Sequence, residues 1–159
     1  MKGTIGSLVF IWSGLEKSLR ISIQKLHAGE IPKSSYGISR SLDAWQQAVT
    51  PRGNNRPLQT VLSNRLVEML KEALVIRNLV CHGLIGIKAQ FHAEEPEANL
   101  TVELGDDKRV LTWSQLQELF GWMSRASWLI DDLTKAAMDN DDERSNARLR
   151  SWERFPNQK

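Results

Sequence analysis

Three long stretches of the chain place apolar side chains at intervals of three and four residues, and this spacing constrains the fold most strongly. They cover residues 4–27, 57–83 and 112–137. Because an α-helix brings such positions onto one face, each stretch predicts a long amphipathic helix that must bury its apolar side. A shorter apolar stripe over 41–49, with Ser41 as N-cap, predicts one more helix.

Residues 84–112 follow a different period, in which apolar side chains alternate with smaller or polar ones. Alternation with a period of two is typical of strands, and GDDK at 105–108 supplies a tight turn. Thr112, with Gln115 three residues later, forms a capping-box signature at the start of the last long helix. The sequence therefore predicts an all-α protein, an antiparallel four-helix bundle with a small antiparallel hairpin or meander inserted before its last long helix.

The length of 159 residues favours a single domain with its own core. We assign residues 1–138 to the bundle and its β-insert, and expect the polar residues 139–159 to form a C-terminal tail or a frayed helix. The net charge of +2 permits a polyanionic partner without requiring one. One cysteine excludes an internal disulfide, and no secretory or membrane-spanning segment is visible, so we expect a soluble cytoplasmic protein without membrane partners.

The stretch ALVIRNLVCHGLIG, residues 73–86, places polar side chains at the end of the second long helix. At about 100° per residue, Arg77, Asn78 and His82 fan across one arc of its last two turns, which leaves the other arc free to pack. The carbonyl groups at a helix C-terminus favour a protonated histidine, and the arginine fork matches phosphate oxygens. Such a pair suits phosphodiester chemistry, in which one residue holds negative charge and the other moves a proton.

The segment RNLVCH resembles the signature of the HEPN superfamily, which is an arginine, four to six residues and a histidine near the end of a core helix. A polar residue, often asparagine, directly follows the arginine in that signature, as Asn78 does here. The first helix carries FIWSGLEKSL, which is similar to a Trp-x-x-Leu-Glu pattern of HEPN-like proteins. The resemblance covers the bundle, roughly residues 4–137.

This resemblance implies a metal-independent ribonuclease that needs no cofactor, of a kind found among toxins and antiviral defence proteins. It implies a homodimer in which two motifs face a shared groove, with RNA as the substrate and an antitoxin or regulatory protein as a candidate partner. Arg77 would bind and polarise the scissile phosphate, His82 would act as general acid or base, and Asn78 would orient one of them. The substrate's own 2′-hydroxyl would attack, which leaves a cyclic phosphate.

The chain departs from one group of HEPN toxins at the position two residues past the histidine. Toxins paired with a nucleotidyltransferase antitoxin carry a modified tyrosine there, whereas this chain has Leu84. Its single tyrosine, Tyr36, falls in a predicted loop. The resemblance therefore does not extend to regulation by that class of partner.

Other polar side chains near the motif have two interpretations. Glu16 lies beside the apolar stripe of the first helix, where it pairs either with Arg77, as a supporting residue of the site, or with Arg20 at the surface. Cys81 precedes His82, but adjacent helical side chains diverge by about 100°, so we interpret it as a small core residue rather than a nucleophile.

No metal site is predicted, because His27 and His92 have no companions at ligand spacing. The sequence also leaves open a non-catalytic alternative to the ribonuclease. In that case the HEPN-like bundle keeps the motif and serves as a dimerisation module, or as a binding module for RNA, a nucleotide or a partner protein.

Overall fold

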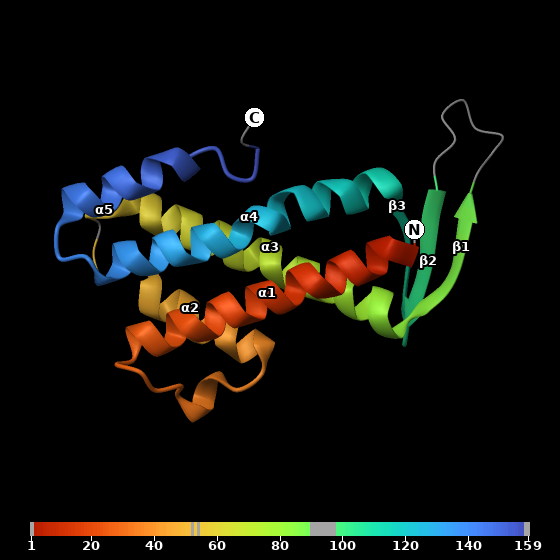
Figure 1. Ribbon diagram of the computed structural model, residues 1–159, viewed down its shortest axis with the longest axis horizontal. Helices are drawn as coiled ribbons and strands as arrows, with labels where there is room; N and C mark the ends of the chain where they lie inside the picture. The colour runs from red at the N-terminus through yellow and green to blue at the C-terminus, as the bar shows by residue number, and fades with distance from the viewer. Residues whose placement is uncertain (1, 52, 54, 90–97, 158–159) are drawn as a thin grey trace.

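The computed structural model describes residues 2–51, 53, 55–89 and 98–157 (Figure 1). This part of the chain is mostly helical, with a small antiparallel sheet, which confirms the predicted mainly-α class. Its helices are α1 (Lys2–Leu26), α2 (Ile38–Val49), α3 (Pro57–His82), α4 (Trp113–Met138) and α5 (Asp142–Leu149), with short 3-10 turns at Lys33–Ser35 and Arg150–Trp152. Its strands are β1 (Leu84–Ala89), β2 (Ala98–Leu104) and β3 (Asp107–Thr112).

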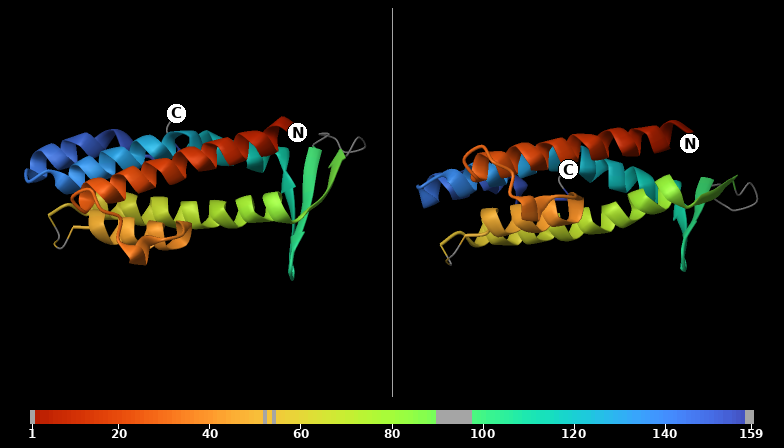
Figure 2. Two further views of the ribbon diagram at one scale, coloured as in Figure 1. Left: turned by 60° about the horizontal axis from the view of Figure 1, so that its bottom comes forward. Right: turned by 90° about the horizontal axis from the view of Figure 1, so that it is seen from below.

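The core lies between the long helices, which run side by side in all three views (Figures 1 and 2). α1 packs most extensively against α4, and α2 contacts α1, α3 and α4. The buried Trp45 of α2 donates a hydrogen bond of 3.1 Å to the Thr134 hydroxyl of α4. The fully buried side chains include Leu8, Leu15, Leu19, Ile23, Leu62, Leu66 and Ile130 of the predicted stripes, and Leu70, Leu129 and Leu133 beside them.

The start of α2 differs from the prediction. The helix begins at Ile38, and its N-cap is Gly37, whose φ of 89° favours a glycine. Ser41 lies inside the helix, and its hydroxyl donates to the carbonyl of Ser35 at 2.7 Å. Ser41 therefore ties the preceding turn to the helix instead of capping it.

The sheet lies at the end of the molecule where α3 ends and α1 begins (Figures 1 and 2). Its strand order is β1-β2-β3, and both pairings are antiparallel, as predicted for the insert. α4 follows β3 directly, with the predicted capping box in place. The Thr112 hydroxyl accepts from the Gln115 backbone N–H at 3.2 Å, and the Gln115 side chain accepts from the Thr112 N–H at 2.9 Å.

Gly83 joins the sheet to the end of α3. The Glu103 N–H of β2 donates to the Gly83 carbonyl at 2.6 Å. A Cβ atom at residue 83 would lie 2.7 Å from the Glu103 carbonyl carbon and closer still to its oxygen. Only glycine therefore permits this approach of β2, which holds the sheet against the helix end.

The C-terminal segment corrects the prediction of a tail or frayed helix over 139–159. α5 folds back along α4, and the aromatic residues after it enter the core (Figure 1). Trp152 is 7% exposed, and Phe155 is fully buried. Arg65 and Arg125 donate to the carbonyls of Phe155 and Pro156, each at 2.7 Å. This segment is therefore packed against the bundle, and only its outer surface is polar.

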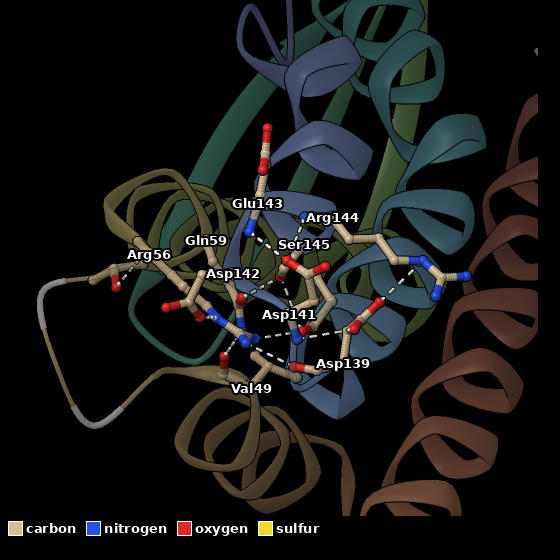
Figure 3. A network of polar contacts seen from close by, with 11 residues as sticks. Val49, Arg56, Gln59, Asp139, Asp141, Asp142, Glu143, Arg144 and Ser145 are labelled. Carbon is tan, nitrogen blue, oxygen red and sulfur yellow. Dashed lines mark hydrogen bonds and ion pairs between the residues drawn. The ribbon is translucent and has the colours of Figure 1, made fainter.

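A polar network fastens the junction between α4 and α5 (Figure 3). Arg56, which precedes α3, donates to the carbonyls of Ala136 and Asp139 at 2.6 Å and pairs with Asp142 at 2.5 Å. The Asp141 side chain caps α5 by accepting from two of its backbone N–H groups. The Arg56 hydrogen bonds join residues 80 and 83 positions apart in the chain, so composition near the C-terminus does not reveal them.

Candidate functional site

The motif arginine lies on the inner face of α3. Arg77 follows Ala73 by four positions and Leu70 by seven, and both of those side chains are buried. The Arg77 side chain is half-buried, and its Nη1 donates to the Asn78 side-chain oxygen at 3.0 Å. Its Nε is buried and has no hydrogen-bond partner among the described residues. Asn78 thus holds one side of the guanidinium fork.

His82 is the last residue of α3, and its side chain is exposed. It follows Val75, which is also exposed, by seven positions, so both lie on the outer side of the helix. Within the described part of the chain, no hydrogen bond or ion pair joins His82 to Arg77 or Asn78. Arg77 and His82 therefore do not face one direction as expected, because the core covers the Arg77 side of α3 and leaves the His82 side exposed.

Glu16 forms neither of the two pairings considered from the sequence. Its carboxylate accepts a hydrogen bond of 2.7 Å from the Trp12 indole, one helical turn earlier in α1. α1 and α3 run in opposite directions, so the N-terminal end of α1 lies at the same end of the molecule as the C-terminal end of α3, which carries Arg77 (Figure 1). Glu16 lies farther along α1, where it borders a 410 Å³ pocket with Arg20 and Tyr36.

The remaining positions around the motif are apolar or small. Cys81 is a half-buried free thiol, and Leu84 begins β1 with its side chain exposed. Gly83, which directly follows the motif histidine, is the residue that docks β2 onto the helix end. The signal that sequence reasoning missed is the spacing of Arg77 from Ala73 and Leu70, which already assigns it to the inner face.

The described residues also bear on two other classes of site, metal centres and membrane-spanning helices. In these parts of the chain, no group of three or more His, Cys, Asp or Glu side chains is arranged to hold a metal ion. None of the helices described combines the length and the apolarity needed to cross a bilayer.

The end of α3 therefore offers two separate groups for chemistry. One is a guanidinium with part of its fork held by an amide, and the other is an exposed imidazole beside the carbonyl end of a helix. A guanidinium holds anionic oxygens, and an imidazole transfers protons near neutral pH. Comparisons with protein-family models, curated proteins and solved structures found no match.

Proposed function

We propose that the protein is a metal-independent endoribonuclease of HEPN type, in which Arg77 and His82 act on the RNA backbone. The observation that carries the proposal is the Arg-Asn pair held at the end of a buried helix, followed by an exposed histidine as its last residue. The proposal includes the finer fold assignment, in which α1–α4 form an antiparallel HEPN-like bundle. A cytoplasmic toxin or defence role belongs to the same proposal.

In this mechanism Asn78 accepts one N–H of Arg77 and fixes the plane of its fork, and the remaining donors hold the scissile phosphate. The 2′-hydroxyl oxygen attacks phosphorus, and the bond from phosphorus to the 5′-oxygen breaks. His82 either takes the proton from the 2′-hydroxyl or supplies one to the departing 5′-oxygen. The products are a cyclic 2′,3′-phosphate and a 5′-hydroxyl.

The proposal requires two copies of the chain. Arg77 and His82 of one copy point to different sides of the helix end, so they do not converge on one phosphate. A two-fold axis beside α3 brings a second motif to the same place and forms a cleft between the two helix ends. RNA and a second copy are therefore the proposed partners.

The test is incubation of the purified protein with total RNA in excess EDTA. We expect wild type to cleave, and His82→Ala to lose activity by about two to four orders of magnitude, the usual effect of removing an acid–base residue. The matched control is His27→Ala, because His27 is also exposed but lies beyond the other end of α1. Full activity of His82→Ala would overturn the catalytic role.

Arg77 needs a variant that separates chemistry from stability, since its side chain is half-buried. Arg77→Met keeps most of the apolar stem and removes the donors. We expect this variant to fold and to cleave at least a hundredfold more slowly than wild type, with Arg40→Ala on α2 as the exposed control. An Arg77→Met variant that folds and cleaves normally would contradict the proposed phosphate contact.

One observation favours a second function, a non-catalytic binding or dimerisation module. Arg77 lies on the core face of α3 with its Nε buried, which is where a structural arginine also lies. In that case wild type and His82→Ala bind RNA or dimerise equally, and neither cleaves. Binding and cleavage measured on the same samples distinguish the two functions.

A further inference from the structure

A groove of about 620 Å³ lies between α3, α4 and β3, apart from Arg77 and His82. Its floor is apolar and includes Ile76 of α3, Leu111 of β3, and Leu119 and Trp122 of α4. Pro156 of the docked C-terminal segment closes one part of the lining. An apolar concavity bordered by a few polar groups is the usual form of a binding site.

One border of the groove is the edge of the sheet. β3 is the last strand in the order β1-β2-β3, and in the described part of the chain it pairs with β2 alone. Three consecutive residues, Arg109, Val110 and Leu111, line the groove. Alternate residues of a strand point to opposite faces, so a lining of three residues in succession fits a strand that presents its edge to the groove. Such an edge offers unpaired backbone N–H and C=O groups.

The charge left unpaired at the rim is negative. Glu72 of α3 and Glu118 of α4 are exposed, and neither forms a hydrogen bond or ion pair with another described residue. The Arg109 guanidinium is already paired with a carboxylate, because its Nε and Nη2 donate to the two oxygens of Asp107 at 2.9 and 3.0 Å. Glu72 acts on Arg109 only through longer-range attraction. The rim therefore complements a cationic ligand.

We propose that this groove binds an extended segment of a partner protein that adds a strand to β3. Its backbone pairs with the free edge of β3, its apolar side chains cover Trp122 and Ile76, and its lysines or arginines lie beside Glu72 and Glu118. Edge pairing selects an extended peptide, and the two carboxylates select basic residues. This surface is separate from the proposed ribonuclease site and does not depend on it.

The probe is the fluorescein-labelled peptide Lys-Thr-Val-Thr-Val-Thr-Lys, whose alternate positions present lysines and valines on one side. We expect saturable binding by fluorescence anisotropy at low salt. The double variant Glu72→Gln/Glu118→Gln should bind about tenfold more weakly, as expected for two partly exposed charge contacts. Glu68→Gln, an exposed position on α3 outside the groove lining, should bind like wild type.

Two further peptides test the mode of binding. Replacing both lysines by glutamates should abolish binding, and so should replacing the central threonine by proline, which cannot donate to β3. Bound peptide should slow hydrogen exchange of those amides of residues 108–111 that point away from β2. The proposal is overturned by no binding at millimolar peptide, by equal binding of the acidic or proline peptide, or by equal affinity of the double variant. RNA, rather than peptide, protecting these amides would overturn it as well.

Discussion

Replacing Gly83 by alanine tests how the sheet is held against the helix that carries the motif. The added methyl would lie 2.7 Å from the carbonyl carbon of Glu103 and nearer its oxygen, and both are backbone atoms. β2 must therefore move away, which breaks the 2.6 Å hydrogen bond from the Glu103 N–H to the Gly83 carbonyl. Loss of that bond costs about 1 kcal/mol, and the steric displacement costs about 1–3 kcal/mol.

We therefore expect Gly83→Ala to lower the free energy of unfolding by about 2–4 kcal/mol. For a chain of 159 residues this corresponds to a fall in Tm of roughly 5–15 °C. The assay is urea and thermal unfolding, followed by the helical circular dichroism signal at about 222 nm. A variant within about 0.5 kcal/mol of wild type would refute the close approach of β2.

The matched control is Gly121→Ala in α4. Gly121 is exposed, and a Cβ built there meets no other atom within 4 Å. Alanine should raise the stability by about 0.5–1 kcal/mol, because glycine costs that much inside a helix. Opposite signs at the two glycines separate the steric effect from the general effect of adding a methyl group.

Three other predictions follow from single contacts. Arg56→Ala should lower the free energy of unfolding by about 2–4 kcal/mol in urea titrations, because it removes the Arg56 hydrogen bonds to the carbonyls of Ala136 and Asp139 and the ion pair with Asp142; a change near that of exposed Arg40→Ala would contradict this. Burial raises the pKa of Asp131, but hydrogen bonds from Lys135 and Lys25 outweigh this and hold the pKa below its usual value. Asp131→Asn should therefore be less stable than wild type at neutral pH, by less than about 1 kcal/mol. The difference in stability should disappear when the pH is lowered below about 4, where the Asp131 carboxylate becomes protonated. A difference that stays constant with pH would refute this linkage. Finally, mixing inactive Arg77→Ala and His82→Ala subunits should partly restore RNA cleavage if each proposed site takes its two residues from different chains, whereas a mixture that stays inactive, although heterodimers form, would exclude that arrangement.

The helices and the insert were predictable because their signals are local. The apolar stripes predict α1, α3 and α4, because each stripe lies within a single helix. Thr112 and Gln115 predict the start of α4, because both partners of the capping box lie within three residues. The start of α2 was not predictable in the same way. Its N-cap is a glycine with positive φ, and Ser41 bonds to a preceding turn whose course the sequence pattern does not define.

The C-terminal segment was mispredicted because its partners are distant in the chain. Its polar composition resembles a solvated tail, yet Arg56 and Arg65, which belong to another part of the sequence, bond its carbonyls and side chains. Around the motif, the sequence identified Arg77, Asn78 and His82, but their directions depend on which face of α3 packs into the core, and the spacing of Arg77 from the buried Ala73 and Leu70 marks that face. The partner of Glu16 is the Trp12 indole, four residues earlier on the same helix, so this contact is local and was overlooked in favour of two arginines.

The most direct test of the central claim is the chemistry of the RNA ends that wild type produces in excess EDTA, compared with His82→Ala. We expect wild-type fragments to end in a cyclic or 3′-phosphate and to begin with a 5′-hydroxyl, and we expect DNA of the same sequence to stay intact because it lacks the attacking 2′-hydroxyl. His82→Ala should yield no such ends above background. Cleavage that requires magnesium and leaves 5′-phosphates, or that persists in His82→Ala, would contradict acid–base catalysis by Arg77 and His82.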